Sequence, residues 1–231
     1  MSAAEKEMGF AWSFSTKATL AVVLTVWFAL AAAAGTSGIL TAGPDQVFRP
    51  VLLSVIVPIA VFLGIFAASP TFRGFVMSQD IRFLTMLQSW RVVGFAFLPL
   101  YAFGVLPGLF AWPAGLGDVA VGLTAPLVVL ALMRRPQFAR SGRFIVWNLL
   151  GLFDFVGAAV TSTLVSGAFP ALSTGSITSA PLEYWPLILF PSFIVPLFVF
   201  MHLSVLFQVR ALRARAGGER RSHHGIIHAA G

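Results

Sequence analysis

VLLSVIVPIAVFLGIFAA, residues 51–68, is a run of eighteen residues without a charged side chain. A helix needs about 20 predominantly apolar residues to cross the ~30 Å hydrocarbon core of a bilayer. The run comes close to that length, and it can be extended toward Arg49 and Pro50. It therefore predicts a transmembrane helix.

Five further stretches of the chain have the same character. With the first, they predict spans at about residues 18–40, 51–68, 91–111, 115–133, 144–166 and 185–208. The whole sequence is 58% hydrophobic and 10% charged, whereas soluble domains carry about 25% charged residues. We expect an all-α, polytopic membrane bundle of six transmembrane helices over residues 18–208, surrounded by lipid.

The basic residues predict the orientation of this bundle. Of the 15 Lys and Arg residues, fourteen fall on one side of the six-span arrangement, and only Arg49 falls on the other. Positively charged loops stay in the cytoplasm. We therefore expect a multi-pass protein of the cell membrane, here a bacterial inner membrane. Residues 1–17 and a disordered basic tail, 209–231, would both lie in the cytoplasm.

The first span has an alternative interpretation. Lys17, an apolar run and the small residues Ala32–Gly35 would also suit a cleaved signal peptide. The run is long for a signal core, which favours a retained span. Cleavage would leave five spans and would not move any later loop to the other side of the membrane.

Two connections of the bundle carry structural signals of their own. Apolar and polar residues alternate between Pro70 and Trp90, and Ser78 and Asp80 can cap a helix start. This segment is either an amphipathic helix on the cytoplasmic surface or an extension of the third span. The short sequence Trp112–Gly115 predicts a tight outer turn between antiparallel third and fourth spans.

Prolines recur in the helices that run from the outer to the inner side. SVIVPIAVF at Ser54–Phe62 and SFIVPLFVF at Ser192–Phe200 are identical at six of nine positions. Three antiparallel helical hairpins with a shared kink would produce this repeat, and so would chance matching among apolar residues. Because proline removes a backbone hydrogen bond, we expect kinks, with an irregular sixth span. The kink positions are Pro58, Pro126, Pro191 and Pro196.

Polar residues inside the spans are the candidate functional residues, because charged groups are costly in hydrocarbon. The candidates are Asp154, His202, Asn148, Asp118 and Arg91. At ~1.5 Å per residue, Asp154 and His202 lie roughly 16 and 12 Å above the inner-edge arginines. We expect these two side chains to pair near the midplane, as in the carboxylate and histidine chains of proton relays.

Each candidate also has a purely structural interpretation. Asp154, Ala158 and Thr161 share one helix face with small residues, so Asp154 would join two helices as a hydrogen-bonding group. Asp118 would cap the start of the fourth span. Arg91 would anchor the inner mouth of the third span.

Several classes of chemistry lack the residues they need. The chain has no cysteine, which removes disulfides and thiolate metal sites. His202 is the only intramembrane histidine, too few for bis-histidine haem, and no lysine lies in a position to bind retinal. We expect no metal and no cofactor, and the net charge of +7 reports topology rather than nucleic-acid binding.

Three functions remain open. The first is a small transporter or proton-coupled permease that uses a polar site near the midplane. The second is a non-catalytic subunit or scaffold, whose partners would be other membrane subunits or further copies of this chain. The third, a lipid-acting enzyme at the interface, has no nucleophile or metal motif to support it.

Overall fold

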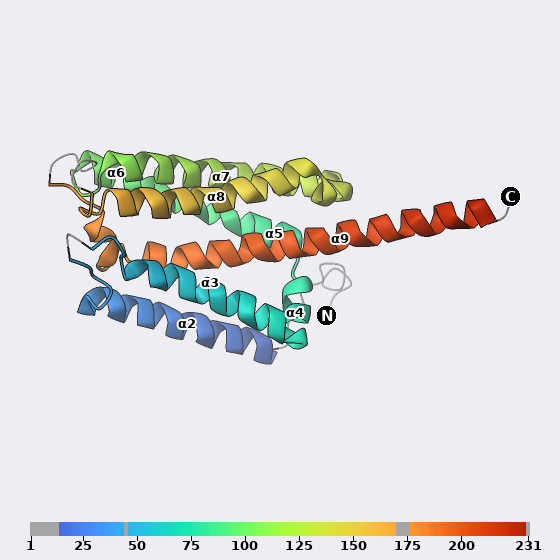
Figure 1. Cartoon of the computed structure of the whole chain (residues 1–231), viewed down its shortest axis with the longest axis horizontal. Coiled ribbons are helices and arrows are strands. Elements are labelled where there is room, and N and C mark those ends of the chain that lie inside the picture. The colour runs from blue at the N-terminus through green and yellow to red at the C-terminus, as the bar shows by residue number, and fades with distance from the viewer. Residues whose placement is uncertain (1–13, 44–45, 170–175, 230–231) are drawn as a thin grey trace.

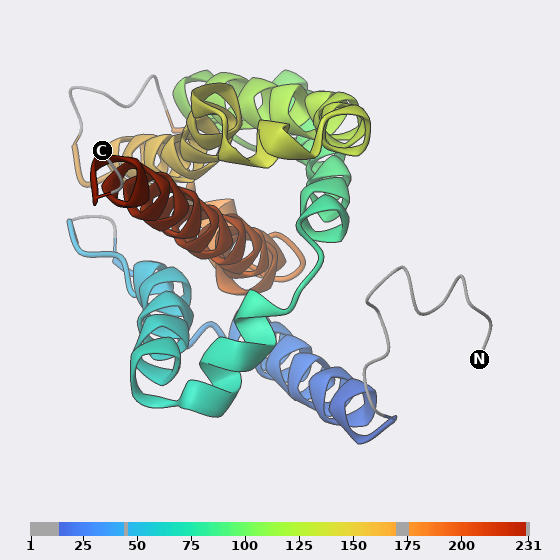
Figure 2. The same ribbon diagram turned by 90° about the vertical axis from the view of Figure 1, so that its right-hand side faces the viewer.

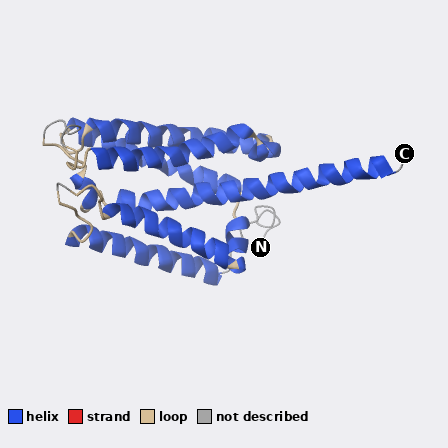
Figure 3. Cartoon of the chain, in the orientation of Figure 1, coloured by secondary structure: helices blue, strands red, loops and turns tan. Residues whose placement is uncertain are grey.

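The structure, a computed structural model, describes residues 14–43, 46–169 and 176–229 (Figure 1). These residues form helices and loops and no strand (Figure 3). Among them are six helices that are long and apolar enough to cross a membrane. The prediction of an all-helical bundle with six apolar helices of membrane-spanning length is confirmed.

The helices follow one another along the chain with short connections. The six candidate spans lie in these helices: α2 (Phe14–Ser37), α3 (Val51–Ala68), α5 (Ile81–Leu87) continued by η1 (Gln88–Ala96) and α6 (Phe97–Ala102), α7 (Gly108–Arg134), α8 (Gly142–Leu164), and η5 (Phe190–Ile194) continued by α9 (Val195–Ala229). The sixth candidate span ends at Ala216. The short connecting helices are α4 (Pro70–Met77), η2 (Pro136–Arg140) and η4 (Ala180–Glu183).

The bundle has two sides joined through its last helix. Helices α6, α7 and α8 gather on one side and α2 and α3 on the other, with α9 and α5 between them (Figures 1 and 2). Helix α9 packs against α3, α5 and α8, and α7 packs against η1 and α8. Helix α2 lies against the π-helical segment η5, where Trp27 and Phe28 make edge-to-face ring contacts with Phe193.

The turn between the third and fourth spans is not at Trp112–Gly115. Helix α6 ends at Ala102, and Gly104 follows with a φ of 69°. The N–H of Val105 donates to Leu100 O and that of Gly104 to Tyr101 O, at 2.8 and 2.9 Å, which is the Schellman pattern that ends helices at glycine. Helix α7 then starts at Gly108, so Trp112 and Pro113 lie inside it.

This earlier turn shifts the third span toward the N-terminus. The span covers Ile81–Ala102 instead of residues 91–111. Arg91 is consequently in the middle of the span, so the prediction that it lies at the inner mouth is wrong. Asp118 lies well inside α7 and does not cap the start of that helix.

The segment between Pro70 and Trp90 was predicted to be either a surface helix or an extension of the third span, and it contains both a separate short helix and the start of the span. Residues 70–77 form the separate short helix α4, capped by the hydroxyl of Ser69. From Ile81 onward the chain already belongs to the third span, and Asp80 caps that start through the backbone N–H groups of Arg82 and Phe83. Ser78 ends α4 instead of starting a helix.

The sixth span is irregular, as its prolines predict. It opens with the π-helical segment η5, which contains Pro191, and Pro196 is the second residue of α9. Pro58 and Pro126 lie inside the continuous helices α3 and α7. Helix α9 continues to Ala229, where we expected a disordered tail. The Ala- and Arg-rich sequence from residue 211 to 216 has high helix propensity.

Candidate functional site

Small residues bring the third span very close to α7. A Cβ atom at Gly122 would lie 2.8 Å from the backbone N of Val92, and one at Gly115 would lie 3.3 Å from the backbone O of Gly94. A Cβ atom at Gly94 would collide with the side chain of Asp118. The 3₁₀ segment η1, which carries Arg91, can therefore lie directly on α7.

Arg91 is the centre of the site that this packing creates. Its side chain is fully buried, with 0% exposure. Nε donates to Oδ1 of Asp118 at 2.7 Å, and Nη2 donates to Oδ2 of Asp154 at 2.5 Å. Nη1 donates to the backbone O of Gly151 at 3.1 Å. The guanidinium carbon also lies 4.0 Å from the ring centroid of Phe155.

His202 and Asn148 continue the polar network toward α9. Nη1 of Arg91 lies 3.3 Å from Nε2 of His202. Because a guanidinium can only donate, Nε2 is the acceptor and the ring proton is on Nδ1. Nδ1 then donates to Oδ1 of Asn148 at 2.9 Å, and the Asn148 amide donates to Phe144 O. This arrangement requires a neutral imidazole.

The five predicted polar residues therefore meet in one network, and its central residue is Arg91 instead of the expected pair of Asp154 and His202. We expected Asp154 to pair with His202; instead, both side chains contact Arg91. The expectation that Asp154 joins two helices describes part of the geometry, because its bond to Arg91 connects α8 to the third span.

The network carries a surplus negative charge when both aspartates are ionised. Arg91 supplies one positive charge, Asp118 and Asp154 supply two negative charges, and His202 is neutral. Apolar clusters lie on both sides, one around Phe97, Leu106 and Phe110 and the other around Leu84 and Phe144. Charges in such surroundings are poorly screened, so one added positive charge would be strongly stabilised.

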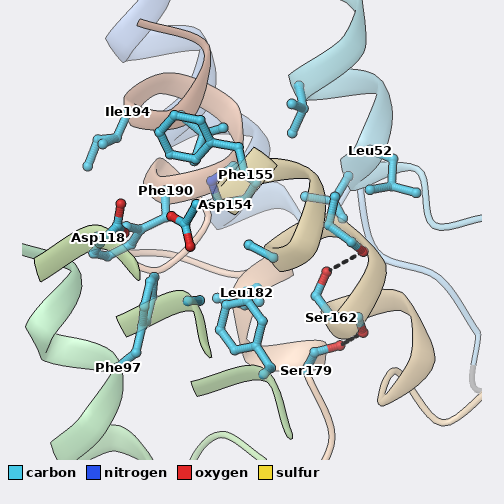
Figure 4. A pocket seen from close by; sticks show the side chains of 18 of the residues that line it. Leu52, Phe97, Asp118, Asp154, Phe155, Ser162, Ser179, Leu182, Phe190 and Ile194 are labelled. Atoms are coloured by element: carbon cyan, nitrogen blue, oxygen red, sulfur yellow. Dashed lines mark hydrogen bonds between the residues drawn. The ribbon is translucent and has the colours of Figure 1, made fainter. Parts of the chain in front are cut away.

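A cavity of about 90 Å³ lies beside the network (Figure 4). Both Asp118 and Asp154 line it, and their side chains retain 13% and 15% exposure whereas Arg91 has none. The remaining wall combines aliphatic side chains, the hydroxyl groups of Ser162, Thr163 and Ser179, and five aromatic rings, those of Phe97, Phe110, Phe155, Phe190 and Phe198. Arg91 also borders the cavity, but the two carboxylates are the more exposed groups of the network.

A second buried ion pair lines the same cavity. Arg49 and Glu183 meet through Nη2 and Oε1 at 2.7 Å, with side chains that are each 4% exposed. Oε2 of Glu183 accepts from Ala42 N, and Nη1 of Arg49 donates to Gly43 O. The pair therefore fastens the connection after α2 to the segment that precedes the sixth span.

We did not predict this pair from the sequence, although the sequence carries a signal for it. Arg49 is the lone basic residue on the predicted outer side, and Glu183 is the lone charge in the outer loop before the sixth span. Opposite charges on one side of an apolar bundle are natural partners.

Gln88 is another buried polar residue that the sequence analysis did not select. It lies three residues before Arg91 and is 1% exposed. Its Nε2 donates to Phe198 O at 3.3 Å, while its buried Oε1 has no hydrogen-bond donor among the described residues. Within those residues, no group of three or more His, Asp and Glu side chains could hold a metal ion.

Six helices that are long and apolar enough to cross a membrane indicate a multi-pass helical membrane protein, with a buried charged network beside a cavity. The chain belongs to the family described as a domain of unknown function, DUF8737, whose model matches residues 47–210. Every residue of the Arg91 network, Gln88 and the Arg49–Glu183 pair lies within this range, whereas α2 precedes it. No curated protein and no solved structure matches the chain.

Proposed function

We propose that the protein is a small proton-coupled transporter in which Asp118 and Asp154 carry the exchangeable proton. The observation behind this proposal is the charge balance of the network: two carboxylates share one guanidinium inside an apolar bundle. Intramembrane ionisable residues that pair with one another commonly mark proton and substrate pathways. One proton on either aspartate makes the network electrically neutral.

The surroundings of the network support a route for the proton. The cavity gives the two carboxylates access toward the Arg49–Glu183 pair, which would have to open on that side. Gln88, three residues before Arg91, has a buried oxygen with no donor in the part of the chain that the structure describes. The irregular start of the sixth span is a feature that transporters use near their binding sites.

We also propose the orientation with both termini in the cytoplasm of a bacterial inner membrane. The basic residues support it. Helix α4, the start of α5 and the end of α7 lie at one end of the bundle (Figure 1) and carry Arg73, Arg82 and Arg134, whereas Arg49 precedes α3, which starts at the other end. Arg91 no longer counts toward this asymmetry, since it is buried among the helices. The remaining imbalance still follows the positive-inside rule.

Proton flux into proteoliposomes tests the proposed function. A potassium gradient with valinomycin would set the membrane potential, and a trapped pH indicator would report proton entry. We expect wild-type flux well above that of protein-free vesicles, and a loss of at least about tenfold in Asp154→Asn and Asp118→Asn. Asp80→Asn removes a carboxylate that caps α5 outside the network and is the matched control.

Two results would contradict the proposal. Wild-type vesicles that conduct no more protons than protein-free vesicles would exclude proton translocation. Equal flux in the wild type and in both aspartate variants would show that Asp118 and Asp154 only hold helices together.

A further inference from the structure

The cavity provides a negatively charged end and aromatic walls for a ligand. Arg91 occupies Oδ1 of Asp118 and Oδ2 of Asp154, so each carboxylate keeps one oxygen that is not bonded to the guanidinium. Both side chains border the cavity, and Phe97, Phe155 and Phe190 surround them (Figure 4). Carboxylates beside aromatic faces form a site for a positively charged group.

The same features exclude other classes of ligand. An anion would meet a network that already has a surplus negative charge. An inorganic cation such as Ca²⁺ or Mg²⁺ requires about six oxygen ligands, and among the described residues no group of three or more acidic or histidine side chains could hold a metal ion. An organic ammonium ion needs one negative partner, while its carbon atoms pack against the rings.

We propose, on the basis of the proton-coupled function above, that this cavity binds a small organic ammonium ion in exchange for the proton. The surplus charge of the network holds one positive charge at a time. When one aspartate is protonated, the network is neutral and does not attract a further cation. An ammonium ion that binds in the cavity therefore favours release of that proton. Binding on one side and release on the other would couple the two cations one for one.

The size of the cavity limits the ligand to a few non-hydrogen atoms. A buried water needs roughly 10–15 Å³ of such space, so about 90 Å³ accommodates a compact organic cation. Tetramethylammonium is a suitable probe, because it is compact and permanently charged. It cannot cross the bilayer as a neutral amine, and it cannot itself supply the proton that is measured.

Proton release on binding is the direct test. Detergent-solubilised wild-type protein would be mixed with tetramethylammonium chloride in weakly buffered solution with a pH indicator, at a pH where the network holds its proton. Titration over a range of starting pH values identifies that condition. Potassium chloride keeps the ionic strength constant. We expect up to one proton released per protein at saturation, and none with tert-butyl alcohol, a neutral molecule of similar shape.

Variants can separate the contribution of the carboxylate charges to ammonium binding from that of the space in the cavity. Asp154→Asn and Asp118→Asn should abolish the release, whereas Asp80→Asn should leave it unchanged. Ala159→Phe adds a ring to the cavity wall and should weaken tetramethylammonium binding at least tenfold while the network keeps both carboxylates. Size-exclusion chromatography and thermal unfolding in detergent would show that each variant is folded.

The outcomes distinguish this inference from the proposed function. No proton release by tetramethylammonium at any starting pH, from wild-type protein that conducts protons in vesicles, would overturn the ammonium site and leave proton coupling standing. Sodium chloride could also be added to the potassium chloride solution in place of tetramethylammonium chloride. If it released as many protons, the proposal that the ligand is an organic cation would be overturned. Unchanged binding in Ala159→Phe would exclude this cavity as the site.

Discussion

Arg91 makes more polar contacts than any other side chain in the described network. It contacts both aspartates, the carbonyl of Gly151 and the ring of His202. Removing one partner of a buried ion pair leaves an uncompensated charge and typically costs about 3–5 kcal/mol, while replacing the whole set by neutral groups is often tolerated. Variants that remove one charge and variants that remove all charges can therefore distinguish the role of the network in stability from its role in function.

We therefore expect Arg91→Met to destabilise the protein by about 3–5 kcal/mol. The triple variant Arg91→Met, Asp118→Asn, Asp154→Asn should recover much of that loss and still conduct no protons. Thermal unfolding in detergent and vesicle flux measure the two properties. A triple variant as unstable as Arg91→Met would show that charge compensation is not what stabilises the network.

Asp80 provides a pH-dependent contribution at the start of α5. Its Oδ1 accepts from the backbone N–H of Arg82 at 2.6 Å and of Phe83 at 3.2 Å. Burial raises its pKa, but the hydrogen bonds from Arg82 and Phe83 and the charge of Arg82 outweigh burial, so the pKa lies below its ordinary value. A carboxylate with a lowered pKa stabilises the fold above its unfolded pKa, and this stabilisation is lost as the pH falls.

Asp80→Ala should cost about 1 kcal/mol at neutral pH, the usual value of an N-cap. The difference from the wild type should shrink as the pH falls below about 4, the ordinary pKa of an aspartate. Unfolding in detergent at several pH values measures it, and Asp80→Asn, which preserves a capping oxygen, is the control. A cost that is the same at all pH values would contradict a role for the charge.

Among the elements, η1 and α7 form the contact that positions the network. Gly94 faces Asp118 so closely that a Cβ atom would displace the carboxylate, while a Cβ atom on Gly157 of α8 would meet nothing within 4 Å. Both glycines lie inside helical segments. The two positions therefore have the same residue type in a helical segment and differ in the space available for a Cβ atom.

Gly94→Ala should reduce proton flux and lower the unfolding temperature, because Asp118 would have to move away from Arg91. Gly157→Ala should be neutral or slightly stabilising, since alanine favours helix by about 1 kcal/mol over glycine. Flux and unfolding of the two variants, measured side by side, test this. Equal behaviour of the two would mean that the close approach of η1 does not position the carboxylate.

At the scale of the whole molecule, the Arg49–Glu183 pair borders the cavity, and we propose that it controls access from that side. The chain has no cysteine, so a single Ala159→Cys reports on access to the cavity without background. We expect Glu183→Gln to speed its reaction with a charged thiosulfonate reagent at least tenfold, because the neutral amide holds Arg49 more weakly. An unchanged rate would show that the pair does not control access.

The proposed orientation gives a further prediction for the whole molecule. Val47 and Arg213 are both exposed. Val47 precedes the start of α3, and Arg213 donates to the carbonyl of Arg140 in η2, which follows the end of α7 at the opposite end of the bundle (Figure 1). In intact cells, a membrane-impermeant thiol reagent should label Val47→Cys and not Arg213→Cys, which should react only after permeabilisation. The reverse pattern would mean that the positive loops face outward.

Much of the fold could be predicted from sequence because the bilayer acts as a uniform solvent. A span must be apolar over its whole length whatever it packs against, so six spans and an irregular, proline-rich sixth span follow from local sequence. The five polar candidates were identifiable for the same reason: a polar residue in hydrocarbon needs a partner.

Only the tertiary structure decided which of these residues meet and where. The central place of Arg91 depends on the turn at Gly104 and on glycines of α7 that admit η1, and hydropathy does not resolve a shift of several residues in an apolar run. The Arg49–Glu183 pair joins residues 134 positions apart. Sequence alone determined that charges are buried in this bundle; the packing of helices distant in the chain determined their partners, because ion pairing depends on distances of a few ångströms.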